Sequence, residues 1–167
     1  MSTLKNIQST VKLAASIIIC QLVGISAVLL SQKNSNYWYD TIVMPSWHLS
    51  TYFFGTIWVV LYFLLGISLW LVWDSKISEF NKQNTIILYG TQLFLNFLWS
   101  ILFFRFHSES IAFLNITVLI VLVFISIIQI YKFSKVATWL LIPYFIWICF
   151  EGFLNFKILF LSGYCIE

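Results

Sequence analysis

The polar and large aromatic residues between positions 139 and 155 offer the most evident chemistry in this chain, because they lie four residues apart. These residues are Trp139, Pro143, Trp147, Glu151 and Asn155. Residues four apart are neighbours on a helix surface, but each step of four passes a full turn by about 40°, so only adjacent members share a face. We therefore expect Trp147 and Glu151 to form a local pair.

Glu151 is the acidic residue of this segment, and its neighbours are almost all Leu, Ile, Phe and Cys. An acid in a membrane-spanning helix is a functional-site hypothesis in itself. The structural alternatives are a protonated Glu bonded to a neighbouring helix, or a side chain that snorkels to the interface. We expect burial to keep the carboxyl neutral, as a hydrogen-bond donor.

The composition excludes a water-soluble fold. The 167 residues are 61% apolar, 20% aromatic and 9% charged, whereas soluble domains carry about 25% charged residues. Five stretches are long enough to cross a hydrocarbon core about 30 Å thick, and they are too long and unbroken for barrel strands. They cover about 11–31, 52–73, 85–104, 110–131 and 137–161. The sequence predicts an all-α integral membrane protein, with one domain over 1–167 that is a bundle of five transmembrane helices.

The charged residues are few and scattered. Nine Lys and Arg give a net charge of +3, which does not make the basic patch that nucleic-acid binding needs. Six basic residues on the side of the amino terminus against three on the other predict a cytoplasmic amino terminus. Three cysteines and two distant histidines indicate neither a disulfide framework nor a metal site.

The segment from about 32 to 51 is the longest predicted connection. It contains Tyr39, Asp40, Pro45 and Trp47, and we expect it to form an ordered cap at the membrane interface. Each ring alone is equally typical of an interfacial anchor.

Two further helices carry candidate site residues. The second presents Gly55, Trp58, Tyr62 and Gly66 on one face, which is typical either of a cavity wall or of a ridge packed against a neighbouring helix. The third carries Gln92, Asn96 and Trp99 on one face. Because unpaired amides in lipid cost several kcal/mol, these need partners, either on other helices or on a ligand.

At this point the chain resembles the tryptophan-rich sensory protein and translocator protein family (TspO/MBR), also called peripheral-type benzodiazepine receptors. Four motifs in the family's order carry the resemblance, and they cover nearly the whole chain. They are YWYD and MPSW at 37–47, GTIWVVLYFLLG at 55–66, QLFLNFLWSILFF at 92–104, and PYFIWICFEGFLN at 143–155.

The resemblance implies a homodimeric five-helix protein with a pocket that the first long loop closes. Members bind porphyrins such as protoporphyrin IX, and animal members also bind cholesterol and benzodiazepine-type drugs. Trp58 and Trp147 would be the pocket pair associated with porphyrin binding and light-driven breakdown. The resemblance assigns four residues to the loop that closes the pocket: Tyr39, Asp40, Pro45 and Trp47. It assigns four others to the walls of the pocket or to contacts between helices: Gln92, Asn96, Trp99 and Asn155.

The resemblance implies no required cofactor, and porphyrin would be a ligand. The composition suits a bacterial cell membrane, with membrane lipid as surroundings, but members of the family also occupy outer membranes. Where the family commonly has two adjacent prolines after the loop Trp, this chain has Leu49 and Ser50, which predicts a looser lid. Nothing basic follows Tyr164, so the weak sterol-type motif is absent. Glu151 occupies a position where many members have a small or hydroxyl residue.

Several functions remain open at the level of sequence. A receptor or sensor binds porphyrin in an aromatic pocket, and a degrading enzyme would use the same pocket with turnover in light through Trp58 and Trp147. A transporter of porphyrin or another hydrophobic ligand, and a membrane assembly protein whose rings only pack helices, are the alternatives. Saturable binding separates the assembly protein from the others.

Overall fold

The computed structural model describes the backbone of residues 2–39 and 51–164, and the side chains of residues 6–27, 29–30 and 54–161. Every element in these ranges is an α-helix, joined by short turns. The five helices are α1 (Ser2–Tyr39), α2 (Thr51–Trp73), α3 (Glu79–Phe104), α4 (Glu109–Tyr131) and α5 (Lys135–Tyr164). The prediction of an all-α, five-helix fold is confirmed.

Each helix contains a stretch that is long and apolar enough to cross a membrane. These stretches run over Asn6–Ala27, Phe54–Trp73, Glu79–Phe104, Glu109–Tyr131 and Lys135–Leu161. Much of their apolar surface faces outward: Leu22 is 57% exposed and Leu114 is 65% exposed. Exposing so large an apolar surface to water is unfavourable, whereas contact with the hydrocarbon of a bilayer is not. The outer faces of the bundle are therefore suited to contact lipid.

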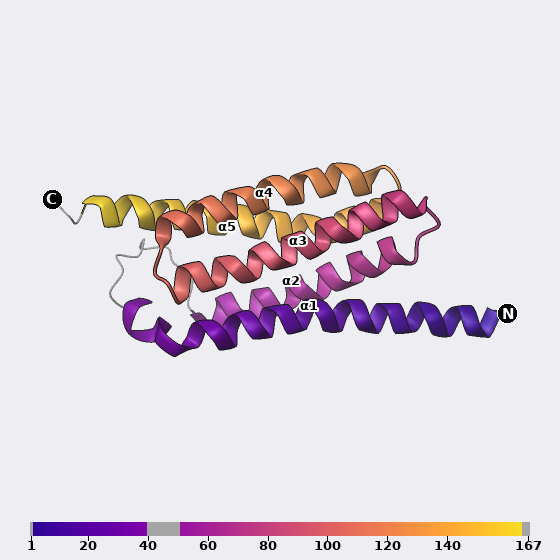
Figure 1. The fold of residues 1–167 in the computed structure, drawn as a ribbon, viewed down its shortest axis with the longest axis horizontal. Helices are drawn as coiled ribbons and strands as arrows, with labels where there is room; N and C mark the ends of the chain where they lie inside the picture. The colour runs from indigo at the N-terminus through magenta and orange to yellow at the C-terminus, as the bar shows by residue number, and fades with distance from the viewer. Residues whose placement is uncertain (1, 40–50, 165–167) are drawn as a thin grey trace.

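The helices run back and forth along the long axis of the bundle (Figure 1), and their contacts close into a ring. In this ring α1 packs on α2, α2 on α5, α5 on α4, α4 on α3, and α3 on α1, with an additional contact between α2 and α3. The start of α1 and the end of α5 lie at opposite ends of the bundle (Figure 1). The start of α2 and the ends of α3 and α5 therefore meet at the end of the bundle that is opposite the amino terminus.

Two helices extend beyond the apolar stretches from which they are predicted. Helix α1 begins at Ser2 rather than about 11 and ends at Tyr39 rather than about 31, so Tyr39 lies at a helix end. Helix α3 begins at Glu79 rather than about 85, since the Ser78 hydroxyl caps it by accepting from the Asn81 N–H. Hydropathy marks where hydrocarbon begins, whereas helical hydrogen bonding continues into the polar flanks.

Small residues allow α1 and α2 to approach closely. A Cβ added at Gly66 would lie 2.7 Å from the Ile17 Cα, and one at Gly24 would lie 2.6 Å from the Tyr62 ring. Ser16 and Cys20, which precede Gly24 at intervals of four, are fully buried. At Gly66 the face of the second helix thus packs against a neighbour, which was one of its two predicted roles.

Candidate functional site

A single carboxyl oxygen joins α2 and α5 at the centre of the site. Trp58 on α2 donates its indole N–H to Oε1 of Glu151 at 2.9 Å, and Trp147 on α5 donates to the same oxygen at 3.0 Å. The Glu151 side chain is only 2% exposed. The expected pairing of Trp147 with Glu151 is present, and Trp58 completes it from a helix distant in sequence.

Aromatic rings from the opposite helix hold each indole in place. Trp147 packs against Phe54 of α2, with 5.4 Å between ring centroids. Trp58 packs edge-on against Tyr144 of α5 at 6.2 Å and lies 5.2 Å from Tyr62 on its own helix. Such ring pairs contribute about 0.5–1.5 kcal/mol each beyond the area they bury, so the geometry of the indole pair is fixed by packing as well as by hydrogen bonds.

A second polar layer lies beside the indole pair and adds α3 to the site. The Tyr62 hydroxyl donates to Oδ1 of Asn96 at 2.9 Å, and Nδ2 of Asn96 donates to the Tyr144 hydroxyl at 3.1 Å. All three side chains are buried. Asn96 therefore connects α2, α3 and α5 through hydrogen bonds between side chains.

Trp99 and Asn155 form a second hydrogen-bonded contact between α3 and α5. In the amide orientation that satisfies both groups, Oδ1 of Asn155 accepts from the Trp99 indole N–H at 3.3 Å, and Nδ2 donates to the Glu109 carbonyl at 3.1 Å. Trp99 also stacks on Phe103 at 5.3 Å. Asn155 thus ties the end of α5 to α3 and to the start of α4.

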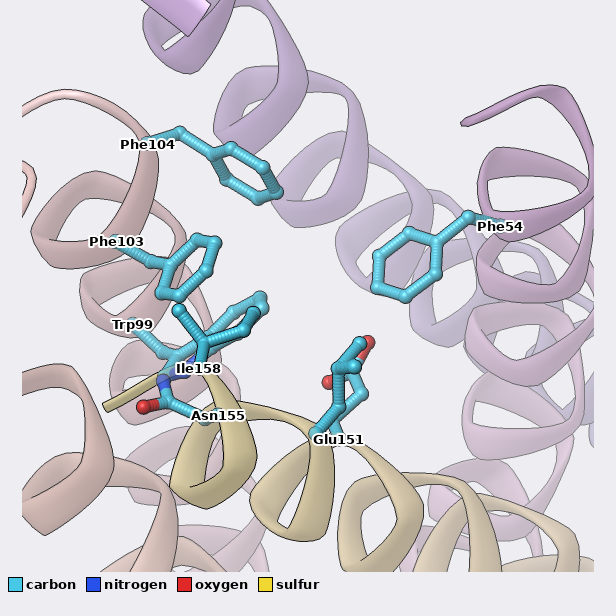
Figure 2. A pocket seen from close by; sticks show the side chains of 8 residues that line it. Phe54, Trp99, Phe103, Phe104, Glu151, Asn155 and Ile158 are labelled. Atoms are coloured by element: carbon cyan, nitrogen blue, oxygen red, sulfur yellow. The ribbon is translucent and has the colours of Figure 1, made fainter. Parts of the chain in front are cut away.

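A small hollow opens beside Glu151, between the start of α2 and the ends of α3 and α5 (Figure 2). Its cavity volume is about 10 Å³, which is roughly the room that one water molecule needs. Its lining is mostly aromatic and aliphatic: Phe54, Trp99, Phe103, Phe104, Glu151, Leu154, Asn155 and Ile158. Trp58 and Trp147 do not line it, and they meet at the carboxyl group instead.

The structure brings most of the predicted site residues together, but not all of them. Gln92 lies in another layer, where its amide donates to the Ser126 hydroxyl of α4; this is the helix-to-helix partner considered for it. Asp40, Pro45 and Trp47 lie outside the described residues, and for Tyr39 only the backbone is described.

Two rings that pack against the indole pair across helices, Phe54 and Tyr144, were not predicted from the sequence. Both had a signal in the sequence. Phe54 precedes Trp58 by four residues, and Tyr144 follows Pro143 within the polar stretch of the last helix. Among the described residues no three His, Cys, Asp or Glu side chains gather as metal ligands would, so rings, amides and one carboxyl are the groups that this site offers to a ligand.

Comparison with known proteins places this arrangement in a family. Residues 16–161, which include all of these site residues, match the family model described as TspO/MBR family. The chain belongs to the TspO/MBR family. A match over this length, with five apolar helices, makes the protein an integral membrane protein.

Relatives of this TspO/MBR protein occur in archaea, bacteria and animals. The chain is 36% identical over 152 residues to the tryptophan-rich protein TspO of Archaeoglobus fulgidus, covering 91% of this chain and 97% of that one. It is 31% identical to the protein of the same name from Chlorobaculum tepidum, over 90% of this chain and 95% of that one. The human translocator protein is 30% identical over 121 residues, 71% of each chain.

Proposed function

We propose that this TspO/MBR protein is a membrane receptor or sensor that binds porphyrin-type tetrapyrroles through the Trp58 and Trp147 indole pair. The observation that carries the proposal is the convergence of these two indoles, from α2 and α5, on one oxygen of Glu151. Membership of the family supports the choice of ligand class.

The physical reason is that a tetrapyrrole is flat and largely apolar, as are the surfaces that this site offers. Moving such a ring out of water is favourable by roughly 25 cal/mol for each Å² of apolar surface buried. Each stacked or edge-on contact with an indole adds about 0.5–1.5 kcal/mol. Two indoles thus orient the macrocycle without metal coordination.

Binding requires the site to widen. Small-molecule sites generally enclose about 300–1,000 Å³, whereas the hollow beside Glu151 encloses about 10 Å³. Figure 2 shows Phe54 on one side of this hollow and Phe103 and Phe104 on the other. In this proposal a tetrapyrrole separates these rings and takes the space that they fill in its absence.

The competing function is a purely structural one, in which the rings pack helices together. The small volume of the hollow and the tight contact of Gly66 with Ile17 favour it. Under this alternative the protein would assemble or stabilise other membrane components and would bind no porphyrin saturably.

Quenching of tryptophan fluorescence separates the two functions. The purified protein in detergent is titrated with protoporphyrin IX in the dark, and the Trp139→Phe variant serves as control, because Trp139 is 70% exposed and lies away from the site. We expect saturable quenching that the control variant shares. Quenching that rises linearly without saturation, as it would for partition into the micelle, would favour the structural function.

A further inference from the structure

One oxygen of the Glu151 carboxyl is fully used by the protein itself. Oε1 accepts from the indole N–H groups of Trp58 and Trp147, and a carboxyl oxygen has two lone pairs that point toward donors. An indole N–H only donates, so neither tryptophan can serve the other oxygen. Among the described residues, no hydrogen bond reaches Oε2.

The same contacts determine which form of the carboxyl fits the site. The ion pairs among the described residues join Lys12 with Asp74 and Lys82 with Glu79, and neither includes Glu151. Glu151 is only 2% exposed, so a carboxylate there would lose most of its hydration without gaining a cation, and two neutral N–H donors replace that hydration only in part. A neutral carboxyl fits better: its carbonyl oxygen is Oε1, and its hydroxyl is at Oε2.

The polar groups in the wall of the hollow differ in whether the protein supplies them with hydrogen-bond partners. Glu151 lines this cavity, and Figure 2 shows its side chain opposite Trp99 and next to Phe54. The other polar groups of the wall, on Trp99 and Asn155, have each other as partners. Glu151, through the hydroxyl at Oε2, is therefore the residue of this wall whose polar group has no partner among the described residues, so this hydroxyl is available to donate to a ligand.

We propose that Glu151 is a ligand-binding residue in its neutral form, which holds the indole pair through Oε1 and donates a hydrogen bond from Oε2 to a carbonyl or carboxyl oxygen of the ligand. This proposal rests on the proposed function and specifies its ligand class. The site selects tetrapyrroles with carboxylic acid or ester side chains over tetrapyrroles with alkyl side chains only.

Two variants separate the two functions of the carboxyl. Glu151→Gln keeps a carbonyl oxygen for the indoles and an N–H donor for the ligand. Glu151→Met keeps the approximate length of the side chain but removes both. Three probes differ only at the periphery of the macrocycle: protoporphyrin IX, its dimethyl ester, and a porphyrin with alkyl substituents only.

The binding result follows from one hydrogen bond. We expect the parent protein and Glu151→Gln to bind the acid and the ester about 3- to 10-fold more tightly than the alkyl porphyrin, as one net hydrogen bond implies. In Glu151→Met this preference should disappear. An unchanged preference in Glu151→Met would overturn the proposal, and so would a gain of tenfold or more in the affinity of Glu151→Gln for the acid alone, because that gain would reveal a repelling carboxylate.

Infrared difference spectra test the form of the carboxyl without any ligand. The spectrum of the parent minus that of Glu151→Gln should show the carbonyl stretch of a protonated acid near neutral pH. The matched control is Glu79→Gln, since Glu79 is 77% exposed and paired with Lys82, and its difference spectrum should show carboxylate bands. Carboxylate bands for Glu151 would overturn the proposal even if all three porphyrins bound. If no porphyrin bound, the proposed function and the ligand preference would both fail, whatever the infrared spectra showed.

Discussion

Replacing Asn96 tests whether the hydrogen bonds beside the indole pair hold three helices together. Asn96→Leu keeps nearly the same volume but removes the acceptor of the Tyr62 hydroxyl and the donor to the Tyr144 hydroxyl. A hydrogen bond between membrane helices contributes about 0.6 kcal/mol on average and up to about 1.7 kcal/mol. Each hydroxyl left buried without a partner adds a penalty. We expect a total loss of about 1–3 kcal/mol in the free energy of unfolding.

The decisive comparison is with the triple variant Tyr62→Phe, Asn96→Leu, Tyr144→Phe. It removes all three polar groups together, so no buried group is left without a partner, and such a replacement is close to neutral. Unfolding in mixed micelles with increasing denaturing detergent should therefore rank the triple variant as more stable than Asn96→Leu alone. A triple variant that is less stable than the single one, or an Asn96→Leu protein as stable as the parent, would refute the reasoning.

Two further predictions concern packing and surface charge. Gly66→Ala should cost about 1–3 kcal/mol of stability, because the added Cβ would meet backbone atoms of Ile17. The control Gly90→Ala, whose Cβ would have nothing within 4 Å, should be neutral or stabilising by up to about 1 kcal/mol. Equal effects of the two substitutions on unfolding in detergent would contradict the close approach of α1 and α2. Asp74→Asn should lower the free energy of unfolding by less than about 1 kcal/mol, and by less still in high salt. The reason is that both side chains of the Lys12–Asp74 pair are about one-third exposed. A loss of several kcal/mol that salt does not change would show that this pair is more than a surface contact.

The fold could be predicted from composition and apolar length, because a bilayer allows few structures to cross it. The helix ends could not, since they are set by local polar contacts. The cap from Ser78 to the Asn81 N–H begins α3 before its apolar stretch, and hydropathy contains no information about such a bond.

Within the site, spacing of four residues predicted the pairing of Trp147 with Glu151, because both lie on one helix. It could not predict that Trp58 donates to the same oxygen, which depends on how α2 packs against α5. The role of Tyr144 could not be predicted for the same reason. Its hydroxyl accepts a hydrogen bond from Asn96 on α3, and residue spacing within one helix carries no information about contacts with another helix. Nor could spacing show that Phe103 and Phe104 would help to fill the hollow beside Glu151.

The central claim is that Trp58 and Trp147 contact the porphyrin directly, and photochemistry with phenylalanine variants tests it most directly. Indole is the most readily oxidised of the common side chains, so an excited porphyrin held against these rings is expected to react through them. The measurement is the rate at which bound protoporphyrin IX loses its absorbance under illumination, in the parent, in Trp58→Phe with Trp147→Phe, and in the Trp139→Phe control. We predict that the double variant keeps most of the binding affinity but loses the light-dependent decay, while the control decays like the parent. Decay at the parental rate in the double variant would contradict the account.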